Sequence, residues 1–157
     1  MKPGTRGESQ SADFDLEVKL AIYRTTARRG LPPRAVELAG ELGASVADLR
    51  AAYSRLAQRR LLVLEPDGLG IRMAPPFSGG PTPHRVRVAG IDYFANCAWD
   101  ALGIPAALHQ PGEVRSRCGQ SREPLRLQVG LKGAQHCAWR FHCLVPAAEW
   151  WKDIVFT

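Results

Sequence analysis

Apolar side chains recur at helical spacing over the first 60 residues, in three blocks separated by turn-forming residues. This spacing predicts helices over about 14–28, 34–42 and 45–60. Asp13 or Asp15 caps the first helix, Gly43 ends the second in a left-handed conformation, and Ser45 begins the third. Residues 1–13 have no apolar core of their own, so we expect a disordered tail there.

Two short strands, 61–65 and 69–73, are predicted next, on either side of the turn Pro66-Asp67-Gly68. Three helices followed by a hairpin are typical of a winged-helix module, which we expect over residues 14–75. Many such modules bind DNA through the third helix. Here the first turn of that helix offers small side chains and the acidic Asp48, and only Arg50 and Arg55 are placed to reach phosphate. Base-specific recognition needs Arg, Asn or Gln side chains near the start of the helix that can contact base edges, so this helix is a poor candidate for sequence-specific DNA binding.

Proline and glycine dominate residues 75–83, so we place a domain boundary there and expect a second domain over 76–157. Alternating apolar positions predict strands within this domain, and helical spacing predicts helices at 92–102 and after Pro146. The expected strands are 84–88, 114–117 and 125–129. The whole chain is therefore expected to be α+β, with a three-helix domain followed by an antiparallel sheet with helices.

A further strand is predicted over His136–Cys143, where residues sort onto two faces. Cys137, Trp139, Phe141 and Cys143 share the apolar face; His136, Ala138, Arg140 and His142 share the other. In an extended strand the two cysteines would lie about 20 Å apart, too far to hold one metal ion together. We therefore expect Cys143 to be a core residue.

Composition narrows the class of protein. The 157 residues are 45% apolar and 23% charged, as in a globular protein, and no apolar run is long enough for a membrane span or a secretion signal. We therefore expect a cytoplasmic protein that does not associate with membranes. The formal charge of +6 invites a nucleic-acid partner, but it is divided evenly between the two halves and concentrates in neither.

All four cysteines lie in the second half, at positions 97, 118, 137 and 143, and no two form a C-x-x-C pair. Free thiols in a reducing compartment are the simplest interpretation. Cys97 and Asp100 are three residues apart on the predicted helix, so a thiol and a carboxyl group share one face. Such a pair can capture a soft metal and move a proton beside it, although, for this spacing taken alone, a packed thiol next to a surface carboxylate is the more common explanation.

Three segments together resemble the organomercurial (alkylmercury) lyase family. They are Pro81-Thr82-Pro83-His84-Arg85-Val86-Arg87-Val88, Asn96-Cys97-Ala98-Trp99-Asp100-Ala101-Leu102-Gly103-Ile104-Pro105-Ala106 and Ser116-Arg117-Cys118. The resemblance implies a winged-helix-like domain followed by an antiparallel sheet around a thiol site. It also implies that Cys97 is the first catalytic cysteine, Asp100 the catalytic aspartate and Cys118 a structural cysteine.

The position of the family's second catalytic cysteine depends on the register. Anchored on Val145–Trp151 without gaps, the position falls on His136; with a one-residue deletion it falls on Cys137. We assign Cys137, because it is a thiol on the apolar strand face. The stretch between Cys118 and Cys137 is shorter than is typical of the family, and the chain ends where the family usually continues, so we expect a site more open to water.

The implied activity is protonolysis of a carbon–mercury bond, which converts an organomercurial substrate into a hydrocarbon and Hg(II). Cys97, Cys137 and Asp100 would surround the mercury, no organic cofactor is implied, and external thiols would accept the Hg(II). The alternative is a soft-metal-responsive transcriptional regulator that uses the three-helix domain to bind DNA.

Overall fold

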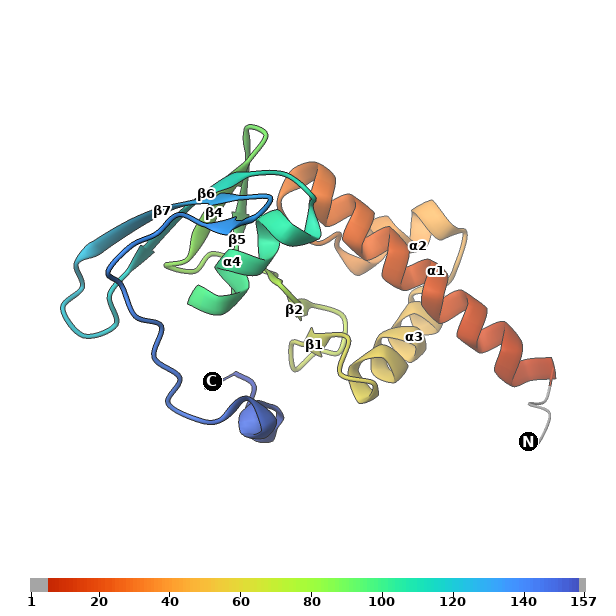
Figure 1. Cartoon of the computed structure of the whole chain (residues 1–157). Coiled ribbons are helices and arrows are strands. Elements are labelled where there is room, and N and C mark those ends of the chain that lie inside the picture. Colours follow the sequence, from red (N-terminus) through yellow and green to blue (C-terminus); the bar gives the residue numbers. More distant parts are fainter. Residues whose placement is uncertain (1–5, 156–157) are drawn as a thin grey trace.

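The computed structural model describes residues 6–155 and has the expected α+β architecture, with helices first and antiparallel sheets after them (Figure 1). The N-terminal part contains helices α1 (Arg6–Arg29), α2 (Ala35–Leu42) and α3 (Val46–Gln58), then strands β1 (Val63–Leu64), β2 (Ile71–Ala74) and β3 (Phe77–Ser78). The order of three helices and a hairpin is as predicted. The division into domains near residue 75 stays a prediction.

Helix α1 begins earlier than expected, so the expectation that Asp13 or Asp15 caps it is wrong: both lie inside the helix. The prediction of a disordered tail over 1–13 is wrong for residues 6–13, which are helical, while residues 1–5 lie outside the described residues. Between Ser9 and Asp13 the chain has no proline or glycine, and the one glycine of the extension, Gly7, lies in the first turn, so the backbone chemistry does not prevent the helix from extending. Helices α2 and α3 agree with their predicted bounds, with Gly43 left-handed at a φ of 62° and Ser45 accepting a hydrogen bond from the backbone of Asp48.

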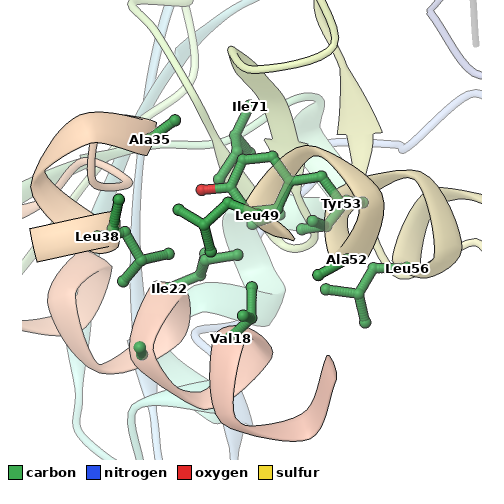
Figure 2. Close-up of a cluster of buried hydrophobic side chains, with 13 residues drawn as sticks. Val18, Ile22, Ala35, Leu38, Leu49, Ala52, Tyr53, Leu56 and Ile71 are labelled. Carbon is green, nitrogen blue, oxygen red and sulfur yellow. The ribbon is translucent and has the colours of Figure 1, made fainter. Parts of the chain in front are cut away.

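The three helices enclose one apolar cluster (Figure 2). Val18 and Ile22 of α1 face Leu38 of α2 and Leu49 of α3, and all four side chains are fully buried. Beside this cluster, the nearly buried carboxylate of Asp15 on α1 accepts two hydrogen bonds from the Arg55 guanidinium on α3. Apolar packing and one ion pair therefore fix α1 against α3.

The hairpin of β1 and β2 has the expected turn, in which the Asp67 side chain accepts hydrogen bonds from the backbone of Leu69 and Gly70. The segment expected to be a linker contains a third strand. Strand β3 pairs with β2. Its apolar residue Phe77, in the middle of the turn-rich stretch, is buried between the two sheets. Phe77 also forms an isolated bridge with Ala95, which joins the small sheet to the larger one.

The larger sheet is antiparallel, with the strand order β5-β4-β6-β7-β8. Helix α4 (Ala98–Ala107) contributes Ala101 and Ile104 to the core beside the sheet, and Figure 1 shows it against one face. The strands are β4 (Arg85–Val88), β5 (Ile91–Phe94), β6 (Gly112–Arg117), β7 (Pro124–Gly130) and β8 (Gly133–Ala134).

The helix predicted at 92–102 is displaced toward the C-terminus, because its first residues form β5 instead. Ala89 and Gly90 both have positive φ, 49° and 84°, as a tight two-residue hairpin turn requires. This turn pairs β5 with β4 and buries Tyr93. The helix then starts only after Cys97 and continues past Gly103.

The strand predicted over 136–143 is absent from the described structure. Beyond β8 the chain runs without regular structure to the 3₁₀ helix η1 (Ala147–Lys152), away from the sheet in Figure 1. A strand needs a partner for its backbone hydrogen bonds, and this segment pairs with none of the described strands. Trp139, Phe141 and Cys143 are consequently exposed, so the expectation that Cys143 is a core residue is wrong.

Helix α1 also contacts the second part of the chain. Tyr23 packs against both apolar clusters and donates a hydrogen bond to the backbone of Pro75, while the Tyr93 hydroxyl donates to the backbone oxygen of Ala27. Across residues 6–155, no helix has the length and apolar character needed to cross a membrane.

Gly30, directly after α1, lies close to the backbone of Asp92 on β5. Its φ is 87°, and a Cβ there would overlap the backbone oxygen of Asp92. We expect Gly30→Ala to lower the free energy of unfolding by clearly more than the ~1 kcal/mol that a left-handed backbone alone costs an alanine. Gly43→Ala is the matched control, since Gly43 is also left-handed but has open space around it. Equal losses in urea unfolding would contradict the close approach.

Candidate active site at the start of helix α4

Cys97 lies at the junction between the sheet and helix α4, where it is the N-cap residue. Its backbone is extended, with φ −147° and ψ 179°, and its Sγ accepts a hydrogen bond from the backbone N–H of Asp100 at 3.5 Å. The sulfur therefore sits at the positive end of the helix, beside backbone N–H groups of the first turn that have no carbonyl partner within the helix. Cys97 and Asp100 lie close together, as predicted. Cys97 caps the helix that contains Asp100, whereas the prediction placed both residues on one face of a continuous helix.

The Asp100 carboxyl group is half-buried, and Asn96 holds it from the other side. The Asn96 Nδ2 donates to Asp100 Oδ2 at 2.9 Å. Burial raises the pKa of Asp100, and the hydrogen bonds from Asn96 and Cys97 oppose that rise without cancelling it. A carboxyl group in this setting holds a proton more readily than one in water.

The Cys97 thiol is also half-buried. Burial raises its pKa; the backbone N–H of Asp100 favours the thiolate, whereas the negative charges of Asp100 and Cys143 disfavour it. The thiol thus keeps its proton until something replaces it. Together, Cys97 and Asp100 form a pair in which a proton released from sulfur has a carboxyl group beside it.

A cavity of about 530 Å³ opens over this pair. Cys97, Trp99 and Asp100 form one side, and residues 141–145 with Trp150 and Trp151 form the other. The two sides touch where the rings of Trp99 and Phe141 pack with centroids 5.8 Å apart. The walls are largely apolar and carry few polar groups, which suits a small organic ligand.

His84 contributes a further polar group to this cavity. Its Nδ1 lies 2.8 Å from the Ser116 hydroxyl, and burial lowers its pKa, so the imidazole is neutral near pH 7. Sequence reasoning missed this residue as part of the site. The signal was present, since His84 belongs to the first of the segments that carry the family resemblance.

The four cysteines occupy different places. Cys97 and Cys143 line the cavity, whereas Cys137 is half-buried and does not line it. His136 is exposed and does not line it either. Cys118 lies in the turn after β6, where its Sγ accepts a backbone hydrogen bond from Ser121. The assignment of Cys137 as second catalytic cysteine stays a prediction.

Within residues 6–155, no group of three or more His, Cys, Asp and Glu side chains is arranged to hold a metal ion. A closed metal site of the structural zinc type is therefore not formed by the described side chains. On α3, Arg55 forms an ion pair with Asp15. One of the two arginines expected to reach phosphate is therefore already paired.

Comparison with known proteins matches the part of the chain that contains this site. The family profile described as MerB, alkylmercury lyase, matches residues 77–157. The chain belongs to the alkylmercury lyase family. The matched residues include Cys97, Asp100 and the far wall of the cavity, so family membership rests on the part of the chain that builds the site.

Two family members give the extent of the similarity. The alkylmercury lyase of Streptomyces lividans is 43% identical over 49 residues, which are 31% of this chain and 23% of that enzyme. The alkylmercury lyase of Bacillus cereus is 37% identical over 62 residues, 40% of this chain and 26% of that enzyme. The chain therefore matches about a quarter of the length of these relatives.

The fold is shared with a solved structure, the mercury-bound form of MerB2. The TM-score is 0.58 at 24% sequence identity, and the match covers 81% of this chain and 65% of that one. The common architecture thus extends well beyond the segment that the family profile matches.

The raised pKa of Asp100 predicts how stability depends on pH. The folded chain binds the Asp100 proton more tightly than the unfolded chain, so the resulting stabilisation is complete below the ordinary value of 3.8. It is lost as pH rises through the higher value of the folded state. We therefore expect Asp100→Asn, which lacks this titration, to become more stable relative to the native chain as pH rises from about 4 to 7. Urea unfolding of both proteins across this range measures the difference, and a constant or falling difference would refute the expectation.

Proposed function

We propose that this chain cleaves the carbon–mercury bond of organomercurials by protonolysis, with Cys97 as the mercury-binding thiol and Asp100 as the proton carrier. The observation that carries the proposal is the pairing of this thiol and carboxyl group in a largely apolar cavity, within the segment matched by the family profile. Soft thiolates favour soft metals, and an apolar cavity accommodates the organic group.

The steps follow from the groups present. Cys97 Sγ bonds to the mercury of R–Hg⁺ and loses its proton to the Asp100 carboxylate. Asp100 then gives that proton to the carbon, the electron pair of the C–Hg bond becomes the C–H bond, and R–H leaves. Mercury is Hg(II) throughout, so no electron donor or acceptor is required.

Burial assists this sequence at two points. The raised pKa of Cys97 keeps the transferable proton on the enzyme, and the raised pKa of Asp100 makes its carboxylate a better proton acceptor than an exposed one. Asn96 orients the carboxyl group through the Oδ2 contact. The remaining Hg(II) would pass by ligand exchange to external thiols, which the cytoplasm supplies in excess.

The test is direct detection of the hydrocarbon. Purified protein is mixed with methylmercury or phenylmercury and excess thiol, and the headspace is analysed by gas chromatography for methane or benzene. We expect release that depends on protein concentration and is lost in Cys97→Ser. Failure to release either product above the thiol-only background would refute the lyase proposal.

A gel-shift assay tests the alternative function, a soft-metal-responsive transcriptional regulator. Binding to a DNA fragment that responds to added Hg(II), without hydrocarbon release, would favour the regulator. The engagement of Arg55 by Asp15 and the small side chains on the exposed face of α3 lead us to expect no such shift.

A further inference from the structure

The cavity over Cys97 is lined by a second thiol, that of Cys143, which the sequence pattern predicted to be a core residue. Cys143 lines the same cavity as Cys97 and Asp100, from the segment that faces the start of α4. Cys137, six residues earlier, does not line it. Because residues 136–143 do not form a strand, the distance argument that separated Cys143 from the site no longer applies.

Specific contacts hold Cys143 on the far wall. Phe141 packs on Trp99, and these rings lie two residues from Cys143 and Cys97 respectively, so one aromatic contact joins the two sides of the cavity that the cysteines line. On the other side of Cys143, the Trp150 indole Nε1 donates a hydrogen bond to the backbone oxygen of Val145 at 2.9 Å. That hydrogen bond lies within the segment itself, and the segment contacts the N-terminal part of the chain where the Arg60 guanidinium lies 5.7 Å from the centre of the Trp151 ring.

Two sulfur ligands are also a suitable number for binding Hg(II) at this site. In the described part of the chain no larger cluster of ligating side chains is present, so mercury at Cys97 would gain at most a small number of protein ligands. Two thiolates that line the same cavity can neutralise the charge of Hg(II) with the softest ligands that proteins provide. A single thiol would leave the second bond of the product ion to water or a small molecule.

We propose that Cys143 is the second mercury-binding thiol of this site, pairing with Cys97 across the cavity in the place that the sequence assigned to Cys137. The identity of the metal rests on the proposed function; the pairing of the two thiols rests on the geometry. With the substrate carried as R–Hg–SR′, the reaction balances: the two thiols supply two protons, one forms R–H, the other forms R′SH, and Hg(II) remains bound to two thiolates.

The pairing is tested by binding, separately from turnover. The full chain is given one equivalent of Hg(II) in the presence of a competing monothiol, and free cysteines are then alkylated with iodoacetamide and identified by peptide mass spectrometry. We expect Hg(II) to protect Cys97 and Cys143 and to leave Cys118 and Cys137 reactive. Protection of Cys97 together with Cys137 would overturn the proposal.

Matched serine variants give the second measurement. Cys143→Ser should weaken Hg(II) retention by more than about 100-fold, since even the loss of groups that only orient a metal ligand costs 10- to 100-fold. Cys118→Ser is the control, because Cys118 lies in the turn after β6 outside the cavity, and it should retain Hg(II) as the native chain does. Because Cys143 is exposed, its serine variant is expected to fold, which circular dichroism checks.

The outcomes separate the two proposals. Retention lost in Cys143→Ser and in Cys97→Ser supports the pair, even if no hydrocarbon is released, in which case only the lyase proposal fails. Retention unchanged in Cys143→Ser refutes the pair, even if hydrocarbon release shows that the chain is a lyase.

Discussion

Replacement of Asp100 by Asn is expected to lower hydrocarbon release by about 10²- to 10⁴-fold, the range that a positioned proton carrier contributes. The amide has nearly the shape of the carboxyl group and can still accept the hydrogen bond from Asn96, but it cannot take a proton from Cys97 and pass it to carbon. Hg(II) retention should be unchanged, because the thiols remain. Headspace chromatography and the alkylation assay measure the two properties separately.

The matched control is Asp92→Asn, the same chemical change at an exposed carboxylate on β5 that pairs with Arg87 and lies outside the cavity. This variant should release hydrocarbon at the native rate. Native turnover in Asp100→Asn would remove Asp100 from the mechanism, and equal losses in both variants would show that the effect is not specific to the site.

The largest expected effect on stability is at Arg55. Arg55→Ala leaves the Asp15 carboxylate, 4% exposed, without the two hydrogen bonds that its guanidinium donates. Breaking a buried ion pair from one side costs about 3 kcal/mol or more, because a charge is left without compensation. For a chain of this size the melting temperature should fall by roughly 6 to 12 °C.

Two further variants show whether the cost comes from the isolated carboxylate. Arg50→Ala removes an exposed cation from the same helix and should change stability by no more than about 0.5 kcal/mol. The double variant Asp15→Ala/Arg55→Ala should be more stable than Arg55→Ala, since no buried charge remains. A double variant that is less stable than Arg55→Ala would show that packing, rather than charge, dominates at this position.

Local chemistry made the N-terminal helices predictable. Gly43 and Ser45 mark helix ends through backbone conformation and capping, and both effects operate within a few residues. The Cys97–Asp100 pair was likewise recognisable from its spacing and surrounding motif. The start of the helix that positions this pair was not predictable. The tight turn at Ala89 and Gly90 makes the following residues a strand, which helical periodicity alone does not reveal.

The far wall of the site was predicted wrongly for a reason of longer range. The alternation over His136–Cys143 is that of a strand, yet a strand also needs a neighbour, and the chain leaves the sheet after β8, which pairs only with Val129 and Gly130 of β7. Whether a segment pairs with a neighbouring strand depends on the whole sheet and cannot be read from the segment itself. The consequence was the placement of Cys143 in the core, when it lies on the cavity instead.

The dual role of Tyr23 bears on how this protein can be divided. The residues matched by the family profile begin at Phe77, but the Phe77 ring packs edge-on against Tyr23 of α1, and Tyr93 reaches back to the same helix. A fragment starting at Phe77 would lose one wall of its core and expose those rings to water. The segment matched by the family profile and the segment expected to fold by itself are therefore not the same, and transferring residues 77–157 to another protein would require α1, or a substitute for it, to be transferred as well.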